Sequence, residues 1–233
     1  MIPLSDGIPA RRFPFVNAGL IAANFAVWLF YELPHLDAAV AHASFYPCSV
    51  DGSCHAPEPW PLGWLTAMFM HGSWDHILGN MLFLAIFGKN VEDAFGHVRY
   101  LALYLAGGFV ATMTQTLMTL IAGSTADAQV PLLGASGAIA AILGAYFVLY
   151  PESRVLTLVV VFLVRIPAWV FLGIWFLASA LASGVTSSPA LFVGGERWEG
   201  ELDADAVSAA LEAAADAKRS TTGPRAAATP RST

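Results

Sequence analysis

Two stretches decide the fold: residues 64–80, WLTAMFMHGSWDHILGN, and residues 134–137, GASG. Both set polar side chains within strongly apolar surroundings. Hydroxyl and ionisable groups are costly at membrane depth, so they indicate a functional site. His76 and Asn80 are four residues apart, which places them on the same face of a helix, one turn from each other.

The composition indicates a membrane protein. Of the 233 residues, 57% are hydrophobic and only 12% are charged, whereas a soluble domain carries about 25% charged residues. The mean hydropathy is +0.62. The net charge of −6 provides no basic surface, so we exclude nucleic-acid partners and expect the lipid bilayer as the environment.

Five apolar segments approach the length of about 20 residues that a transmembrane helix requires. These segments are residues 15–33, 74–88, 98–122, 135–150 and 168–183. We therefore predict an all-α fold, a polytopic transmembrane helix bundle with about five spans. The run 155–164 is too short to span, and we expect it to lie at the interface or to extend the fifth helix. The first segment is longer than the core of a signal peptide, which favours a retained anchor.

The positive residues predict the orientation. Lys and Arg fall in alternate connections, and loops 34–60 and 123–133 contain neither. Under the positive-inside rule, the N-terminus is cytoplasmic and loop 34–60 lies outside. We predict a multi-pass location in the plasma (inner) membrane, with Ser136 near the outer face.

The outer loop 34–60 carries the chain's two cysteines, Cys48 and Cys54. A disulfide and a pair of free thiols are both open, because an oxidising compartment allows the former. A metal site of these thiolates with the flanking His42 and His55 is a further alternative, although the spacing matches no strong zinc pattern. We predict neither a metal nor a cofactor.

His71, His76 and Asn80 form the first polar group. A neutral imidazole and an amide donate hydrogen bonds without carrying charge, which suits the stabilisation of an oxyanion. Two alternatives stay open for this group: polar side chains that bond neighbouring helices together, and a metal or proton site that includes Asp75.

Gly134 and Ser136 form the second group. A serine at a helix start is often only a cap. The fifteen residues from Ser136 to Tyr150, however, span only about 22 Å, against a hydrocarbon core of about 30 Å. The helix therefore begins below one membrane surface, where water can reach Ser136. Free N–H groups at the helix start favour an oxyanion there, and Gly134 permits a close backbone approach.

With both groups in this order, the chain resembles the rhomboid family of intramembrane serine proteases. Further similarity lies in Val91-Glu92, Gly96, Arg154-Val-Leu-Thr-Leu, Ile166-Pro-Ala-Trp and Ser183-Gly184. The resemblance implies a compact bundle of at least six helices that cleaves transmembrane segments of single-span and other membrane proteins.

The resemblance also implies a role for each site residue. Ser136 is the expected nucleophile, and His76 and Asn80 are the expected oxyanion hole. His71 is expected to support the site and the outer loop. Glu92 is expected either to tie the second helix to a neighbouring loop or to be a solvated charge.

The sequence departs from the family after Gly184. Rhomboids place the catalytic base on a sixth helix, but no histidine follows His97 and no apolar span follows Gly184. A serine hydroxyl without a base is a weak nucleophile, and loss of such a base costs about 10⁴ to 10⁶ in rate. We also expect the small residues that normally face the sixth helix to lie against lipid or a partner. These residues are Gly137, Ala140, Ala141 and Gly144.

We predict two parts, a rhomboid-like transmembrane domain over residues 1–184 and a polar tail over 185–233 that is helical over 201–219 and disordered from 220. Three explanations of this arrangement remain open. An altered gene end replaces the sixth helix of a protease, or the chain is a pseudoprotease that binds transmembrane helices without cutting them. The third is a small transporter or sensor with a metal or proton site.

Overall fold

The computed structural model describes residues 2–159, 162–186, 192–193 and 196–197. The chain divides into two units, Met1–Ile174 and Trp175–Thr233. The described part of the second unit holds the end of α10 (Ala168–Thr186) and a two-stranded antiparallel pair, β4 (Phe192–Val193) with β5 (Glu196–Arg197). The predicted tail helix at 201–219 and the disorder from 220 lie outside the described residues.

The first unit is mostly helical, and its apolar helices follow the predicted segments. Their bounds are α1 (Phe15–Val27) with its π-helical extension η1 (Trp28–Glu32), α5 (Trp74–Phe83) with its π-helical extension η2 (Leu84–Gly88), α6 (Lys89–Phe95), α7 (His97–Ala122) and α9 (Ser136–Leu149). Each begins within one residue of an expected start, except α6, which was not separated from the second segment.

Two of the described helices, Phe15–Glu32 and His97–Ala122, are long and apolar enough to cross a membrane. The apolar helices Ser136–Leu149 and Ala168–Leu177 are shorter. The helical class of the fold is confirmed, whereas the number of spans stays a prediction.

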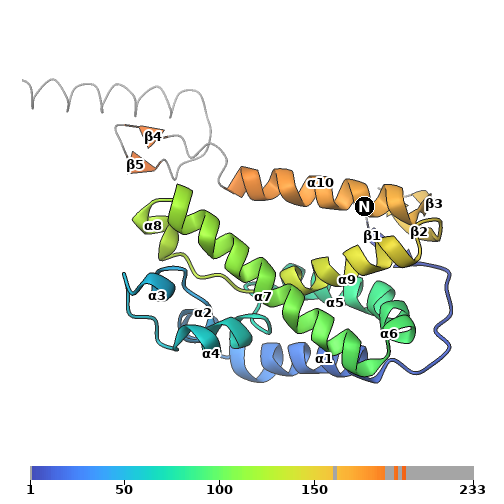
Figure 1. The fold of residues 1–233 in the computed structure, drawn as a ribbon, viewed down its shortest axis with the longest axis horizontal. Coiled ribbons are helices and arrows are strands. Elements are labelled where there is room, and N and C mark those ends of the chain that lie inside the picture. Colours follow the sequence, from blue (N-terminus) through green and yellow to red (C-terminus); the bar gives the residue numbers. More distant parts are fainter. Residues whose placement is uncertain (1, 160–161, 187–191, 194–195, 198–233) are drawn as a thin grey trace, which may run out of the picture. The chain divides into compact units, whose positions relative to one another are not determined.

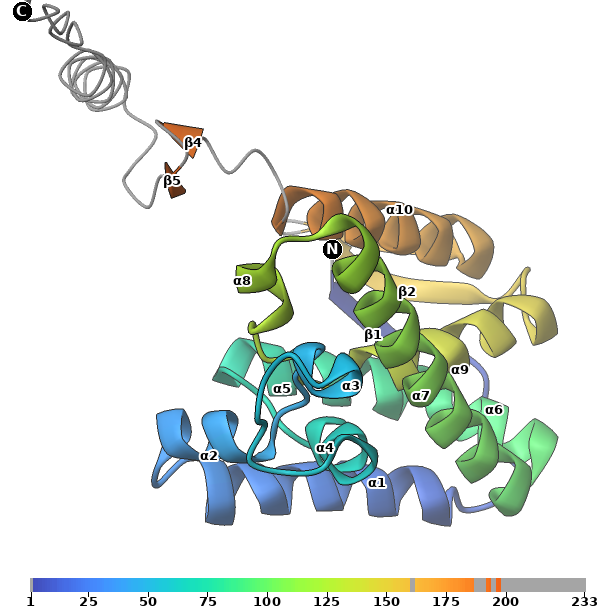
Figure 2. The same cartoon turned by 60° about the vertical axis from the view of Figure 1, so that its left-hand side comes forward.

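The connections between the long helices contain short helices. These are α2 (Leu36–Ala43), α3 (Cys48–Asp51), α4 (Trp60–Ala67) and α8 (Thr125–Ala128). Figures 1 and 2 show all four at one end of the bundle, while α6 lies toward the other end. Phe45 and Leu132 exchange two backbone hydrogen bonds of 2.9 and 2.7 Å, which join the two connections. Cys48 and Cys54 form a disulfide, so the alternatives that needed free thiols are wrong.

Residues 155–164 do not extend the fifth helix, which was one of the two alternatives expected for them; the other, a place at the membrane interface, stays a prediction. This run contributes to a hairpin of β2 (Arg154–Val159) and β3 (Phe162–Pro167), and β1 (Ile2–Ser5) pairs with β2 on its other side. Val155 and Thr157 are fully buried on one face of β2. Such branched side chains fit a pleated surface, and strand pairing satisfies the backbone of a segment too short to span.

Helices α7 and α9 pack closely through small residues. A Cβ added to Gly107 of α7 would stand 2.3 Å from Cβ of Ala141, and one added to Gly137 would stand 2.5 Å from Cβ of Ala111. Gly137 and Ala141 therefore face α7, which corrects the expectation that they lie against lipid or a partner. Gly144 has open space where a Cβ would stand.

Glu92 of α6 holds the start of α1. Its two carboxylate oxygens accept the backbone N–H groups of Val16 at 3.0 Å and Asn17 at 2.7 Å. These N–H groups have no partner within the helix, and a negative charge suits a helix N-terminus. Glu92 is only 2% exposed, so it ties two segments together and is not a solvated charge.

Candidate active site

Ser136 is the first residue of α9, and its side chain is exposed. Its hydroxyl has no hydrogen-bond partner among the described residues. The preceding turn is fixed by Gly134, whose N–H donates to the carbonyl of Ala67 at 2.8 Å. Gly134 has a φ of +115°, a conformation that side chains disfavour. The turn therefore presents the Ser136 hydroxyl openly at the start of a helix.

The imidazole of His76 lies against this turn. A Cβ added to Gly134 would stand 2.8 Å from both Cε1 and Nε2 of His76, and 3.8 Å from Oγ of Ser136. Only glycine leaves this space, so the ring of His76 and the hydroxyl of Ser136 both lie within 4 Å of the point where a Cβ of residue 134 would stand. Ser73 caps α5 by accepting the His76 N–H at 3.2 Å, which fixes the start of the helix that carries His76.

His71 and Asn80 complete the cluster. The rings of His71 and His76 meet edge to face with centroids 5.0 Å apart, and Nδ2 of Asn80 lies 3.1 Å from Nε2 of His71. The amide donates in this bond, so Nε2 of His71 accepts and the ring proton lies on Nδ1. The amide keeps a second N–H for another acceptor.

His71 lies between α4 and α5, outside the helices that are long enough to span. Burial, and in second place the neighbouring His76, lower its pKa to about 4. The ring is therefore neutral near pH 7, which is the form that accepts the Asn80 amide. The preceding Met70 packs with Ala39 and Ala43 of α2, so the loop that carries His71 is anchored to the connection between α1 and α5.

Glu32 was not among the predicted site residues. This residue is fully buried at the end of η1, and its Oε1 accepts the backbone N–H of His71 at 2.6 Å. Oε2 of Glu32 and Nδ1 of His71 are also buried and have no partner among the described residues. A lone carboxylate at the end of the first apolar run was the available signal, because a buried charge there requires a partner.

The structure therefore brings all five predicted site residues into one cluster and adds Glu32. The cluster contains neutral donors, a free hydroxyl and the start of a helix, a set suited to holding an oxyanion beside a nucleophile. Within the described residues, no three His, Cys, Asp or Glu side chains are placed to hold a metal ion. Asp75 is exposed, and His42 pairs instead with Glu58 at 3.6 Å.

A family model described as Rhomboid domain matches residues 58–194, which include every residue of this cluster except Glu32. The chain belongs to the rhomboid family. This match ends ten residues beyond Gly184, the point at which the sequence departs from the family pattern.

Among the relatives of this rhomboid-family chain are proteins named presenilin-associated rhomboid-like protein, mitochondrial. Those of Bos taurus and Homo sapiens are each 30% identical over 136 residues, covering 58% of this chain and 33% of the relative. RHOMBOID-like protein 1 of Arabidopsis thaliana is 31% identical over 112 residues, covering 48% of this chain and 28% of the relative. The match thus spans about a third of the length of these relatives. No solved structure matches the chain.

The comparison corrects the predicted location. The presenilin-associated relatives carry the word mitochondrial in their names. They point to a mitochondrial membrane, so the prediction of a plasma (inner) membrane is contradicted. The distribution of Lys and Arg distinguishes only the two sides of a bilayer and does not identify the organelle that contains it.

Proposed function

We propose that this chain carries a serine endopeptidase site that acts on transmembrane segments of other membrane proteins. In this proposal Ser136 is the nucleophile, and His76 and Asn80 donate hydrogen bonds to the oxyanion, with His71 holding Asn80. The supporting observation is the contact at Gly134, where the ring of His76 takes the space that any other residue would fill, next to the Ser136 hydroxyl. Family membership adds weight to this assignment.

The proposed fold is a polytopic bundle with about five spans. Five apolar helices follow the five predicted segments, two of which satisfy the length for spanning by themselves. The shortness of α9 supports the proposal. A helix of 14 residues is about 21 Å long, whereas a hydrocarbon core of about 30 Å requires about 20 residues to cross. Ser136 would therefore lie below the surface of the core.

Within the part of the chain that the structure describes, we identify no general base for Ser136. No histidine follows His97 in the sequence, and the hydroxyl of Ser136 has no acceptor among the described residues. His76 is a poor substitute because its ring is placed to donate toward an oxyanion. Hydrolysis by this chain is therefore expected to be slower than that of a complete serine hydrolase by about 10⁴ to 10⁶.

This absence favours a second candidate function. A rhomboid-type cluster without a base retains its donors and its exposed Ser136, and such a chain binds transmembrane helices without cutting them. The two candidates share the site and the partners, and they differ only in whether a peptide bond is broken.

The test uses the full chain in liposomes with a single-span substrate that carries a photocrosslinker. The Ser136→Ala variant is the control for chemistry, and incubation over days allows for a rate that is 10⁴ or more below normal, about the loss expected without a base. Cleavage that disappears in Ser136→Ala supports the peptidase. Crosslinking near α5 and α9 without cleavage supports the binder. If neither cleavage nor crosslinking is observed, both functions are rejected.

A further inference from the structure

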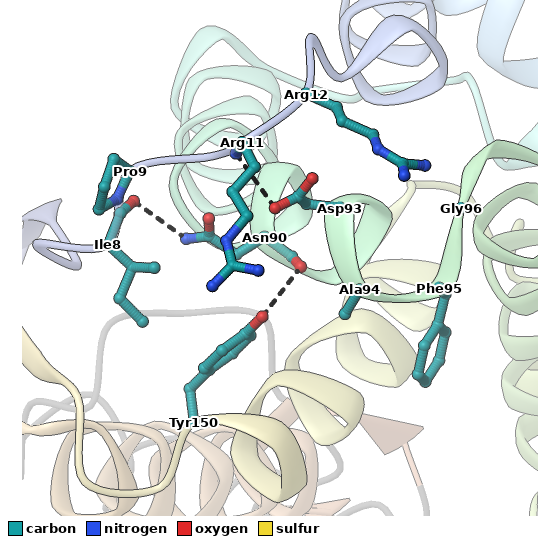
Figure 3. Close-up of a pocket in the computed structure, with 10 residues that line it drawn as sticks. All are labelled: Ile8, Pro9, Arg11, Arg12, Asn90, Asp93, Ala94, Phe95, Gly96 and Tyr150. Carbon is teal, nitrogen blue, oxygen red and sulfur yellow. Dashed lines mark hydrogen bonds between the residues drawn. The ribbon is translucent and has the colours of Figure 1, made fainter.

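A second polar site lies at the other end of α1. A cavity of about 470 Å³ is enclosed by residues 8–12 of the N-terminal segment, by α6 and by Tyr150 (Figure 3). Glu32 and the Ser136 cluster lie at the far end of the same helix, which with η1 contains 18 residues and is about 27 Å long. The cavity is therefore separate from the proposed peptidase site, and its volume is typical of a small-ligand pocket, roughly 300 to 1,000 Å³.

Two arginines face this cavity without a partner. Neither Arg11 nor Arg12 forms an ion pair or a side-chain hydrogen bond with another described residue, and both are exposed. In Figure 3 the guanidinium of Arg11 extends between Asn90 and Tyr150. A guanidinium offers several N–H donors in a fixed plane that matches the oxygens of a phosphate.

Asp93 is the one acidic residue among the described residues that line the cavity, and it has a structural role. Its Oδ2 accepts the backbone N–H of Arg11 at 3.1 Å, which fixes the segment that carries both arginines. Two positive charges against one negative charge leave the lining of the cavity with a net positive charge. The cavity therefore favours an anion.

The side-chain amide N–H groups of Asn90 and the hydroxyl of Tyr150, which also line the cavity, already form hydrogen bonds. The amide of Asn90 donates to Asp6 and, at 3.5 Å, to the carbonyl of Ile8, while the hydroxyl of Tyr150 donates to the Asn90 carbonyl at 3.5 Å. Nearby Lys89 pairs with the fully buried Asp6 at 3.4 Å. Among the described lining residues, Arg11 and Arg12 are therefore the cationic side chains that no bond of this kind occupies.

A pair of exposed aromatic side chains follows the two arginines in the sequence. Phe13 and Phe15 are 63% and 67% exposed, and their ring centroids are 4.7 Å apart. Exposed aromatic residues next to arginines at the start of an apolar helix are typical of the level of lipid headgroups, and basic pockets at that level bind phosphate headgroups.

We propose that this cavity binds a phosphate ester anion through Arg11 and Arg12. The source of the phosphate is either the headgroup of an anionic lipid or a soluble phosphate compound. The proposal is independent of the peptidase proposal, since no residue of the Ser136 cluster lines the cavity.

Native mass spectrometry of the full chain in detergent separates these sources. One arm measures retention of phosphatidylglycerol against phosphatidylcholine, and the other measures the thermal shift produced by glycerol phosphate and inorganic phosphate. The test variant is Arg11→Gln/Arg12→Gln. The matched control is Arg99→Gln, which removes one charge from an exposed arginine of α7 outside the cavity.

Retention of phosphatidylglycerol by the native chain and by Arg99→Gln, with a loss of about tenfold or more in the double variant, establishes a lipid headgroup site. A thermal shift by glycerol phosphate that the double variant loses, without lipid retention, establishes a soluble ligand. Equal binding by the double variant and the native chain in both arms overturns the proposal, as does binding in neither arm. Should the double variant fail to fold, displacement of phosphatidylglycerol from the native chain by inorganic phosphate decides the lipid arm.

Discussion

Oε1 of Glu32 accepts the backbone N–H of His71 at 2.6 Å, across 39 residues of sequence. The bond joins the end of the first apolar helix to the loop that precedes α5. His71 in turn contacts Asn80 and His76. Glu32 is therefore a positioning residue, since it reaches the site cluster only through the backbone of His71.

Replacement of this carboxylate tests the positioning role. In Glu32→Leu the buried N–H of His71 loses its acceptor, and we expect a loss of about 1 to 3 kcal/mol in the free energy of unfolding. Glu32→Gln keeps an acceptor oxygen and should lose less. Unfolding in detergent, followed by circular dichroism, measures both, and a Glu32→Leu variant as stable as the native chain would contradict the role.

Gly134→Ala is expected to disturb the cluster directly. Its Cβ would stand 2.8 Å from the ring of His76, at a φ of +115°, a combination of overlap and backbone strain worth about 1 to 3 kcal/mol. We expect the ring to be displaced and the free energy of unfolding to fall by this amount. Gly144→Ala on α9, the helix that follows this turn, is the control, because nothing lies within 4 Å of the added Cβ. Equal stability of the two variants in detergent would argue against the contact between Gly134 and His76.

The contact of α7 with α9 predicts a steric effect far from any proposed chemistry. Gly107→Val would place a branched side chain where a Cβ alone stands 2.3 Å from Cβ of Ala141. Overpacking of this kind costs about 1 to 3 kcal/mol. Gly19→Val on α1 controls for the change in helix propensity, because nothing lies within 4 Å of a Cβ added to Gly19. Chemical denaturation of both variants in detergent checks the difference, and similar stabilities would mean that the helices separate easily.

His71 predicts a dependence of stability on pH. Its pKa is about 4 in the folded chain, against an ordinary value of 6.5, so between these values the unfolded chain binds a proton and the folded chain does not. The contribution of neutral His71 to the free energy of unfolding is therefore complete above pH 6.5. It falls by about 3 kcal/mol as the pH drops to 4.

The free energy of unfolding, measured from pH 7 to pH 4, checks the predicted direction of this change. In His71→Gln the dependence of stability on pH should be shallower. An unchanged slope in His71→Gln would show that other groups cause the acid sensitivity.

The sequence predicted the long helices well because their cause is local. Each is a continuous apolar run, and such runs form helices whose backbone groups are bonded internally. The strands in segment 155–164 were not predicted, for the complementary reason. Their conformation depends on pairing between β2 and β3 and on pairing of β2 with residues 2–5, about 150 positions away, and the distant partner cannot be identified from the local pattern.

The candidate site was predictable in part. The spacing of His76 and Asn80, and the sequence around Ser136, identified the residues, because a helix turn and a glycine turn are short-range features. Glu32 could not be connected to them by spacing. Likewise, Gly137 was assigned to a missing sixth helix, whereas the structure places it against Ala111 of α7.

The sequence alone determined the apolar composition, the helical segments, the identity of the polar residues and the absence of a histidine after His97. The tertiary structure decided which of those residues meet: His76 against Gly134, Glu32 under His71, and Glu92 at the start of α1. The physical reason is that hydrophobicity acts on each segment separately, whereas a buried polar group requires a partner that only the packing of distant segments can supply.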